Sequence, residues 1–474
     1  MAVENKIAQL KKRTGAIVPF SAEPITQAIL RAADAIGGFA QDIIPNTIYM
    51  AFKGKSDAEI AELLTDDVIM CLNSNRSLTS RETPPNVEAV QDMVVHVLRS
   101  RGFIATADVY EVYRWGRIKV REGDIPMDKF AGNGYPEAKW AETWKWNEAH
   151  NCETIQKLNA WVLSGRFSEL VGASIAQYES NLDAVVDAFL KKGRVRLLLV
   201  TGPSSSGKTT TTNKIAERLG KHHLKLRALN LDDYFWGLAE YPQDAFGDWD
   251  FETPQALQLD LINQHLQELL DGKTIRKPIY DFKHGRSIRE AESLKIEDDE
   301  VLLLDSLHGL YPPMTSSIPE NLKFKLFIEA LCVVKLGDGA DGIYTKSTDL
   351  RMLRRMLRDR IHRNHDPRMT LGHWHFVRKG ELRDMVPYSR TVDIVINGGL
   401  GFELPVLKAC MGPDFPDPKP FLDQGRLDAY TRGERVKRLL DSLVAQPDIS
   451  TKVIPEDCHL REFIGGSLYD KKPK

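Results

Sequence analysis

The chain has 474 residues, of which 42% are hydrophobic and 27% are charged, and its formal net charge is -2. This length favours two or three domains that can each bury a core, and the composition excludes a disordered or fibrous protein. A nearly neutral chain has no long-range field that attracts a polyanion, so nucleic acid and anionic membranes are not expected as partners.

The sequence carries no targeting or disulfide signal. Its first residues lack the apolar core of a signal peptide, and no apolar run is long enough to span a bilayer. The five cysteines lie far apart without a C-x-x-C pair, which is typical of reduced thiols. Together these features predict a cytoplasmic protein that acts on a small molecule.

The first predicted unit covers residues 1–120 and is mainly helical. Apolar positions recur at helical spacing between about 5 and 118. One helix is well marked: it runs from Val87 to Leu98 with apolar residues on one face, and Gly102 ends it. We expect this face to belong to a hydrophobic core.

Residues 121–192 are predicted to connect this unit to the next. Between 121 and 150 the chain is rich in Trp, Lys, Glu and Pro without a sustained period, which is typical of a connector. Helical spacing resumes from about 155 to 192. Residues 194–200 then form an apolar run that indicates a buried parallel strand, so the architecture is expected to change there.

A phosphate-binding loop follows this strand. Residues 202–209 match G-x-x-x-x-G-K-[ST] between a predicted strand and a predicted helix that ends at Gly220. Backbone N–H groups would converge on phosphate oxygens, Lys208 would reach the outer phosphates and Thr209 would ligate Mg²⁺. The alternative, a Gly/Ser-rich turn that matches by chance, does not explain the flanking elements. The residues expected to bind ATP here are Gly202, Ser204, Ser205, Ser206, Gly207, Lys208, Thr209 and Thr210.

Acidic and aromatic residues follow the second predicted strand, at 232–236. Ligands of open α/β sheets bind at the carboxyl ends of the strands, and a kinase needs a carboxylate there to orient its acceptor hydroxyl and take the proton. The alternative is that the aspartates cap the next element while the rings join the core. The phosphate loop upstream favours a catalytic role for Asp232.

Further apolar runs at 301–304, 326–328 and 392–396 alternate with amphipathic helices, which predicts a parallel sheet covered by helices. One of these helices is expected to start at Thr253-Pro254 and to end at Gly272. The run at 301–304 is followed by Asp305, a carboxylate placed to stand beside Mg²⁺.

An arginine-rich segment from Arg354 to Arg363 is predicted to be helical. Guanidinium groups pair bidentately with the oxygens of a transferring phosphoryl group, so Arg355 and Arg358 are candidate catalytic cations. A solvated basic helix face is the alternative. No group of histidines has the spacing of a transition-metal site, so no such metal is assigned.

Residues 193–442 are therefore predicted to form one kinase domain. The segment 443–474 is polar and contains prolines, and we expect it to pack on that domain. Because residues 232–252 contain no Lys or Arg that could hold a phosphorylated acceptor, an uncharged acceptor is favoured.

The motifs and their order resemble the uridine kinase and phosphoribulokinase group of phosphate-loop kinases. The matching segments are 202–209, 232–235, 250–254, 278–286 and the arginine-rich helix. Residues 460–467 also look like the C-terminal signature of long bacterial-type nucleoside kinases. The resemblance covers about residues 155–470 and implies an α/β fold, with a P-loop NTP hydrolase-type parallel sheet flanked by helices.

The resemblance also implies individual roles, beginning with Asp232 as catalytic base. The implied Mg²⁺ ligands are Thr209, Asp232 and Asp305. The implied phosphate contacts are Lys208, Arg355, Arg358 and Arg363. The residues implied around a nucleoside are Asp232, Tyr234, Phe235, Glu252, Tyr280, Phe282, His284 and Arg286.

Three positions depart from the family pattern near the chemistry. The Glu-Gly at the family's acidic strand end is here Asp305-Ser306, its ribose-binding Asp is Glu252, and one lid Arg is His365. Asp305 is one methylene shorter than the family's Glu at the metal position, and Glu252 is one methylene longer than the family's Asp at the ribose position. The preferred sugar or polyol is therefore left open.

The N-terminal region resembles the ATP-cone, a nucleotide-sensing regulatory module, through residues 12–20 and 107–117. The resemblance implies that Lys12, Arg13 and Gly15 bind a regulatory nucleotide. The alternative is a cone-like fold that serves packing or oligomer contacts only.

Taken together, the residues and the resemblance predict a phosphotransferase with an alcohol acceptor. ATP with Mg²⁺ would give its γ-phosphoryl group to the 5′-hydroxyl of a nucleoside, uridine or cytidine by the family default. One alternative is a kinase of another small hydroxyl compound, such as a sugar or sugar phosphate. Another is a nucleotide-sensing regulator with little transfer activity. The oligomeric state is open and includes a homo-oligomer.

Overall fold

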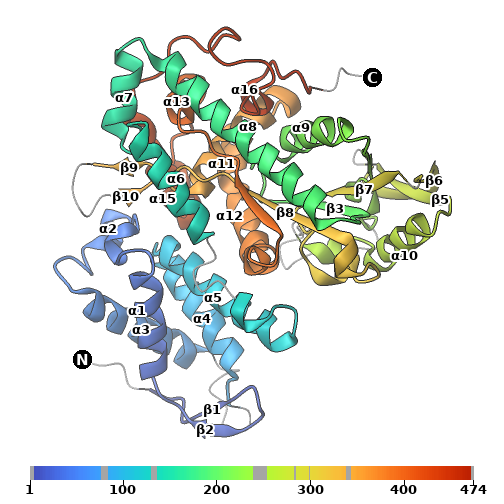
Figure 1. Ribbon diagram of the computed structural model, residues 1–474. Helices are drawn as coiled ribbons and strands as arrows, with labels where there is room; N and C mark the ends of the chain where they lie inside the picture. The colour runs from blue at the N-terminus through green and yellow to red at the C-terminus, as the bar shows by residue number, and fades with distance from the viewer. Residues whose placement is uncertain are drawn as a thin grey trace. The chain divides into compact units, whose positions relative to one another are not determined.

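The computed structural model describes most of the chain (Figure 1). The described residues are 5–75, 84–129, 136–238, 253–281, 284–297, 299–337 and 343–470. They fall into two compact units. The first joins the chain up to Arg117 with Asp417–Arg435, and the second holds most of Ile118–Pro416 together with Val436–Lys474. Within the described residues, no helix is long and apolar enough to cross a membrane.

The first unit is a helical bundle with a small hairpin. Its helices are α1 (Glu23–Asp34), α2 (Asn46–Tyr49), α3 (Asp57–Ser74), α4 (Val87–Ser100) and α5 (Ile104–Glu122), and its antiparallel strands are β1 (Gln9–Lys11) and β2 (Ile17–Pro19). Ile29, Leu64 and Leu98 are fully buried in its core. The Asn86 side chain caps the start of α4, and Gly102 follows its end with a φ of 82°. The helix predicted at 87–98 is therefore confirmed.

A segment from far along the chain belongs to this first unit. Residues 417–435 contain α14 (Lys419–Asp423) and the start of α15 (Leu427–Ser442). Asp428 of this segment bonds Arg432 at 2.6 Å and Arg99 at 3.1 Å. The sequence places 417–435 in the kinase domain at 193–442. In the structure this segment groups with the first unit, and its Asp428 pairs with Arg99, which lies 329 positions away in the sequence.

Three helices of the second unit precede its sheet: α6 (Glu137–Ala149), α7 (Ile155–Leu163) and α8 (Phe167–Lys192). The connector predicted at 121–150 contains the helix α6, which the sequence analysis does not locate. Only Asn147 of this helix is buried, so no apolar stripe reveals it. The helix is held by polar and ring contacts: Asn147 Nδ2 donates to Val333 O at 2.7 Å, and the Trp140 ring meets the Tyr344 ring edge-on at a centroid distance of 5.4 Å.

Five parallel strands form the central sheet of the second unit. They are β3 (Leu197–Thr201), β4 (Lys225–Ala228), β7 (Glu300–Asp305), β8 (Lys323–Glu329) and β11 (Ile394–Asn397). Their order is β11-β8-β3-β7-β4, and the central strand β3 is buried along its whole length. The predicted parallel sheet is thus confirmed. All carboxyl ends lie at one edge, where ligands of such sheets bind.

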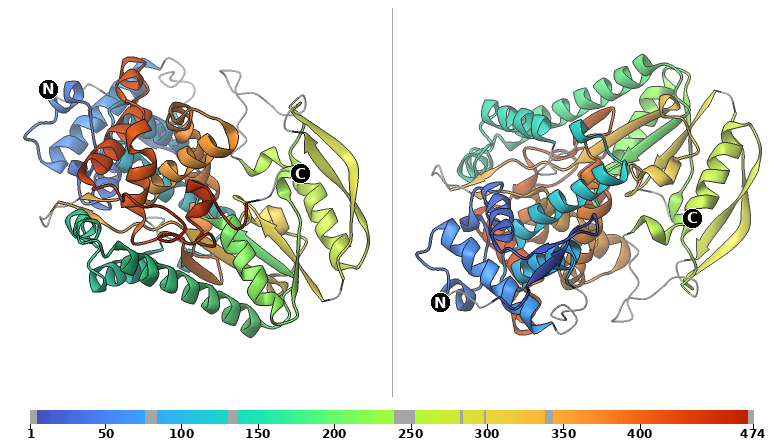
Figure 2. Two further views of the ribbon diagram at one scale, coloured as in Figure 1. Left: turned by 90° about the horizontal axis from the view of Figure 1, so that it is seen from above. Right: turned by 90° about the horizontal axis from the view of Figure 1, so that it is seen from below.

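Helices cover both faces of this sheet. Leu197 and Leu199 of β3 join Leu302 and Leu304 of β7 in an apolar cluster that includes α10 (Leu259–Leu270). The helices α8 and α9 (Lys208–Gly220) pack beside each other against the other face (Figure 2). The continuous apolar runs follow from this arrangement, because a strand covered on both faces has no polar side.

An antiparallel hairpin extends the second unit beside α10 (Figure 2). Its strands are β5 (Ile275–Asp281) and β6 (Arg286–Leu294). The sequence analysis does not predict this hairpin because β6 is mostly exposed and has no apolar alternation. The predicted start of the preceding helix is also wrong: the Thr253 side chain bonds Gln255 in a separate 3-10 turn, and α10 begins at Leu259. Its predicted end at Gly272 is confirmed, with a φ of 77°.

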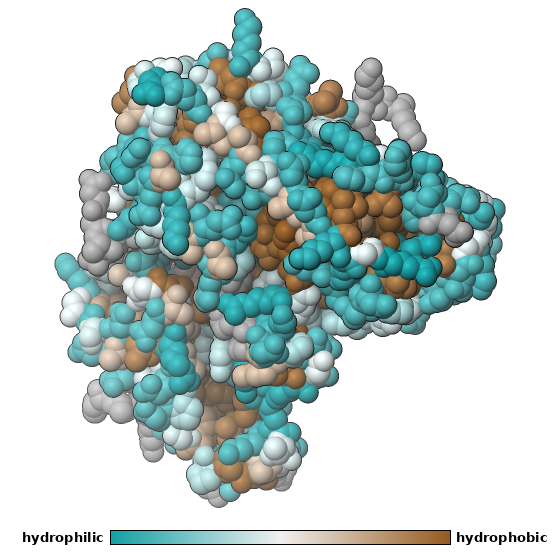
Figure 3. All heavy atoms as spheres, viewed as in Figure 1, coloured by the Kyte–Doolittle hydropathy of each residue, from teal (hydrophilic) through white to brown (hydrophobic). Residues whose placement is uncertain are grey.

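The remaining helices of the second unit follow β8. They are α11 (Ser347–Arg363), α12 (Pro367–Asp384), α13 (Glu403–Met411) and α16 (Arg461–Ile464), and the short strands β9 (Lys335–Leu336) and β10 (Ile343–Tyr344) pair antiparallel. Helix α11 packs against α12, α13 and α16, so the C-terminal segment meets the arginine-rich helix. Figure 3 shows hydrophilic side chains over most of the viewed face, with hydrophobic ones in separate areas.

Candidate active site

The phosphate loop connects the central strand β3 to α9. Gly207, directly before the helix, has a φ of 94°, a left-handed conformation that glycine adopts without strain. A Cβ on Gly202 would lie 2.2 Å from the carbonyl oxygen of Ile328, so glycine is required there. Within the described chain, the buried hydroxyls of Ser205 and Ser206 have no hydrogen-bond partner. The loop thus offers unpaired polar groups beside the N-terminus of a helix, which suits an anion.

Lys208 lies over this loop. Its Nζ donates to the carbonyl oxygen of Gly202 at 2.9 Å and to that of Pro203 at 3.3 Å. Burial lowers the pKa of Lys208, and the nearby carboxylates of Asp305 and Glu462 oppose this effect. The ammonium group is therefore positioned between the phosphate loop and the acidic side of the site.

Two arginines of α11 donate hydrogen bonds to backbone carbonyl oxygens of the phosphate loop. Arg351 donates to the Ser204 carbonyl at 3.1 Å and also pairs with Glu381. Arg354 donates to the Ser205 carbonyl at 3.2 Å and also pairs with Glu403. Both guanidinium groups and both glutamates are buried. Neither arginine is assigned a role from the sequence, although Arg351 lies four residues before Arg355 and Arg354 lies four residues before Arg358, which is a usable signal.

The three predicted phosphate contacts lie farther out on the same helix. Arg355, Arg358 and Arg363 surround the buried carboxylate of Asp359, at 3.3 Å, 3.2 Å and 3.4 Å respectively. Arg355 also donates to the Ser204 hydroxyl at 3.1 Å, so it reaches the phosphate loop directly. This cluster places positive charge beside the phosphate loop, and Arg355 connects the cluster to Ser204.

The two aspartates after β4 have different surroundings. Asp233 pairs with Lys277 at 2.8 Å, whereas the Asp232 carboxylate accepts no hydrogen bond from a described residue. The surrounding protein and the Asp233 charge raise the pKa of Asp232, against the effect of Lys208 and Arg363. Tyr234 is fully buried and its hydroxyl bonds His265 at 2.8 Å, so it belongs to the core rather than to the surface of the site.

Asp305 stands at the carboxyl end of β7, on the other side of Lys208. Burial, with the charges of Glu462 and Asp232, raises its pKa to about 6 although Lys208 lowers it. Its carboxylate also accepts no hydrogen bond from a described residue. Thr209 is exposed in the first turn of α9. A hydroxyl with two unpaired carboxylates is an oxygen-only set that suits Mg²⁺ held together with phosphates. The described residues include no preformed cluster of three metal ligands.

A residue of the C-terminal segment contacts the same site. The Glu462 carboxylate of α16 accepts a hydrogen bond from the Thr210 backbone N–H at 3.2 Å and another from the Thr210 hydroxyl at 3.0 Å. These donors belong to the first turn of α9, where a helix attracts anions. The sequence analysis does not assign Glu462 to the site, because 252 positions separate it from Thr210.

Comparison with known proteins agrees with this geometry. Residues 197–399 match the Phosphoribulokinase / Uridine kinase family, and residues 9–117 match the ATP cone domain. A uridine kinase of Deinococcus deserti is 30% identical over 213 residues, which cover 44% of this chain and 91% of that protein. The chain belongs to the phosphoribulokinase/uridine kinase family. Its phosphate loop and parallel sheet are therefore those of a family kinase, preceded by an ATP-cone domain.

Other members of the family show similar coverage. A uridine kinase of Ligilactobacillus salivarius is 29% identical, over 42% of this chain and 84% of that protein. Among solved structures, a possible uridine kinase from Bacillus stearothermophilus is 17% identical with a TM-score of 0.26, over 32% of this chain and 80% of that one. Each of these uridine kinases matches less than half of this chain.

The residues that the family resemblance implies around a nucleoside are only partly brought together. Phe235 and Tyr280 lie side by side, with ring centroids 5.5 Å apart. His284 and Arg286 instead bind Asp281 at the turn of the hairpin, at 2.7 Å and 3.4 Å. Two further predicted residues, Glu252 and Phe282, lie outside the described residues.

The predicted regulatory residues occupy the turn between β1 and β2 of the ATP-cone domain. Gly15 has a φ of 87°, and its N–H donates to the Lys12 carbonyl at 2.9 Å. Arg13 donates to Glu88 at 2.6 Å and to Gln91 at 3.0 Å. The turn therefore has a defined shape, and its cation Arg13 is already paired.

Proposed function

We propose that this family kinase transfers the γ-phosphoryl group of ATP, in the presence of Mg²⁺, to the 5′-hydroxyl of a nucleoside. One observation carries the proposal. Among the described residues, neither Asp232 nor Asp305 has a hydrogen-bond or ion-pair partner; the pKa of both carboxyl groups is raised, and the charge of Lys208 in the phosphate loop acts on both. A hydroxyl bound between Asp232 and the loop would lie where its proton can be taken while a phosphoryl group arrives.

Each group of the site has a task in this reaction. Lys208 holds the outer phosphates above the loop, and Arg355, Arg358 and Arg363 add positive charge from α11. Thr209 and Asp305 would hold Mg²⁺, which when bound offsets the negative charge of the outer phosphates. Asp232 accepts the proton of the acceptor hydroxyl, and a raised pKa makes this carboxylate a stronger base than an ordinary aspartate.

The choice of a nucleoside rests on the acceptor side of the site. Phe235 and Tyr280 offer adjacent aromatic surfaces on which a base can stack. The segment 232–252 contains no Lys or Arg, so it has no cation for a phosphorylated acceptor. The relatives named above are uridine kinases, which points to uridine or cytidine.

A substrate panel tests this proposal. ADP formation is measured with Mg²⁺ and ATP in the presence of uridine, cytidine, adenosine, ribose or ribulose 5-phosphate. Uridine or cytidine is expected to stimulate ADP formation, and the 5′-monophosphate is identified by mass spectrometry. Stimulation by ribulose 5-phosphate alone would replace the nucleoside by a sugar phosphate, and no stimulation by any acceptor would contradict the proposed transfer.

The ATP-cone domain supports a second, regulatory proposal. We propose that a nucleotide bound at the turn of Lys12, Arg13 and Gly15 changes the kinase rate. The match of residues 9–117 to the ATP cone and the defined shape of this turn support it. The rate is measured against ATP and dATP concentration for the full chain and for Lys12→Ala. An identical nucleotide response in both proteins would contradict the proposal.

A further inference from the structure

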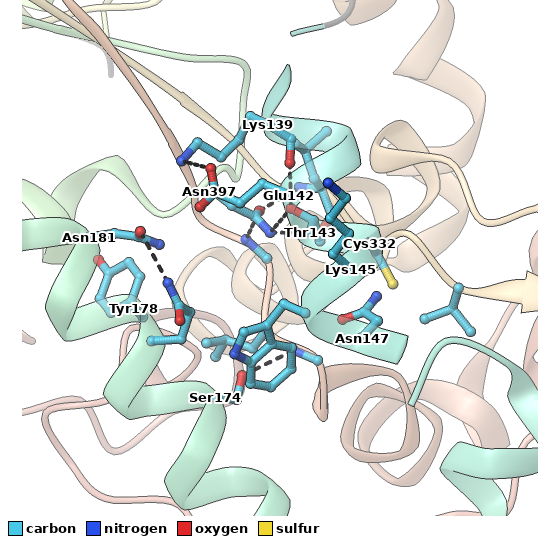
Figure 4. Close-up of a pocket in the computed structure, with 17 residues that line it drawn as sticks. Lys139, Glu142, Thr143, Lys145, Asn147, Ser174, Tyr178, Asn181, Cys332 and Asn397 are labelled. Atoms are coloured by element: carbon cyan, nitrogen blue, oxygen red, sulfur yellow. Dashed lines mark hydrogen bonds and ion pairs between the residues drawn. The ribbon is translucent and has the colours of Figure 1, made fainter. Parts of the chain in front are cut away.

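The second unit contains a cavity of about 300 Å³ that does not include the phosphate loop among its walls (Figure 4). Helix α6 forms one wall and α8 another. The segments 331–334 and 397–401, which follow β8 and β11, close the remaining sides. This volume lies at the lower end of the range for pockets that hold small ligands.

The frame of this cavity is built from satisfied hydrogen bonds. The Asn397 Oδ1 atom accepts from the backbone N–H groups of Leu331 at 2.8 Å and Gly399 at 2.7 Å. Asn147 donates to the Val333 carbonyl at 2.7 Å, which joins α6 to the segment after β8. The cavity is therefore a formed part of the fold, and these amides are not available to a ligand.

Other polar groups on the same walls are unused. Within the described chain, the indole N–H of Trp146 and the ammonium of Lys145 have no hydrogen-bond or ion-pair partner. Gln177 reaches Asn181 only at 3.5 Å, so most of the hydrogen-bonding capacity of these two amides is open. Lys139 is paired with Glu142 at 2.7 Å, which leaves Lys145 as the unpaired cation among the described lining residues.

We propose that this cavity binds a planar nitrogen heterocycle that carries an acidic group. The rings of Trp146 and Tyr178 line the cavity. Each packs against a histidine ring, His150 at 3.9 Å and His459 at 4.1 Å, and the surface that it turns to the cavity can contact an aromatic ring. The amides of Gln177 and Asn181 can donate to and accept from the N–H and C=O edge of a heterocycle. Lys145 supplies the charge that an acidic substituent needs.

The cavity combines segments inside and outside the part of the chain that matches the family, and residues 331–334 and 397–399 lie inside that part. Helices α6 and α8 lie outside residues 197–399, which match the family, so two of its walls are additions to the family core. Tyr178 links the cavity to the first turn of α9. Its ring lines the cavity, while its hydroxyl lies 2.6 Å from the Thr211 hydroxyl in the first turn of α9. The proposed ligand site is therefore connected to the helix that begins at the phosphate loop.

Three probes that differ in single properties test the ligand class. Orotate is planar and charged, dihydroorotate is charged but puckered, and uracil is planar but uncharged. Each is titrated into the full chain by isothermal titration calorimetry. Orotate is expected to bind. Dihydroorotate should bind about three- to tenfold more weakly than orotate because ring stacking is lost. Uracil should bind about tenfold or more weakly than orotate because the pair with Lys145 is lost. Absence of orotate binding, or equal binding of all three, would overturn the proposal.

A matched pair of exposed lysines tests the site. Lys145→Gln is expected to weaken orotate binding about tenfold, whereas Lys191→Gln at the end of α8 leaves it unchanged. Equal affinity in the two variants would overturn the assignment to this cavity. The titration is repeated with an excess of a non-hydrolysable ATP analogue and Mg²⁺. Retained orotate binding supports a separate site, and complete displacement would assign the cavity to the ATP site. None of these readouts depends on the kinase reaction.

Discussion

The donor side and the acceptor side of the site are built in different ways. On the donor side, Arg351 and Arg354 bind loop carbonyls and pair with buried glutamates. On the acceptor side, Asp232 and Asp305 accept no hydrogen bond from described residues and have raised pKa values. The phosphate loop is therefore held in place by hydrogen bonds and buried ion pairs, whereas the carboxylates on the acceptor side have no hydrogen-bond donor among the described residues. Substitutions on the two sides should therefore separate stability from activity.

The largest expected effect is on the acceptor side. Asp232→Asn removes the base without changing the size of the side chain, so kcat should fall by about 10²- to 10⁴-fold. The midpoint of thermal unfolding should stay the same or rise, because the variant removes a negative charge that the surrounding protein and Asp233 disfavour. Asp233→Asn is the neighbouring control: it breaks the ion pair with Lys277 and should lower stability more than rate. If Asp232→Asn lowers stability but leaves the activity unchanged, Asp232 is a structural residue and not the catalytic base.

The matching experiment on the donor side concerns Arg354. Arg354→Ala leaves the carboxylate of Glu403 buried without its partner, which typically lowers the free energy of unfolding by about 3–5 kcal/mol. Urea unfolding measures this loss. Arg360→Ala on the same helix removes an exposed pair with Asp414 and should change stability by about 1 kcal/mol or less. Equal losses in the two variants would show that the buried pair does not fix the loop.

Asp305 should make activity and stability respond to pH in opposite directions. Its pKa is raised to about 6 from a usual value of 3.8, so it loses its charge, and its hold on Mg²⁺, as the pH falls through about 6. The affinity for Mg²⁺ with an ATP analogue should fall in that range. The folded protein binds this proton more tightly than the unfolded chain, so protonation between pH 6 and 4 favours folding. Asp305→Asn should abolish both responses, and a response that persists would assign it to another group.

The smallest expected effect concerns Glu462. Its carboxylate occupies donors of Thr210 and raises the pKa of Asp305. In Glu462→Gln, phosphates no longer meet this negative charge, so we expect the KM for ATP to fall about two- to fivefold. The pH below which Mg²⁺ is lost should move lower. Steady-state kinetics across pH measure both effects, and an increase in KM would mean that Glu462 assists nucleotide binding.

Sequence patterns predict those features that depend on neighbours along the chain. The phosphate loop is recognisable because glycines, a lysine and a threonine must follow one another between a strand and a helix. Apolar runs indicate the buried parallel strands, and Asp305 can be placed at the sheet edge because it directly follows such a run. Asp232 can be placed there because it follows the second predicted strand.

Only the tertiary structure decides features that join distant segments. The roles of Arg351 and Arg354, the contact of Glu462 with Thr210 and the place of Asp417–Arg435 in the first unit all depend on partners far along the chain. Helix α6 gives no apolar period because polar and ring contacts hold it. Hydrophobic periodicity records which face of an element is buried, but it does not record which other element covers that face, and these contacts depend on that choice.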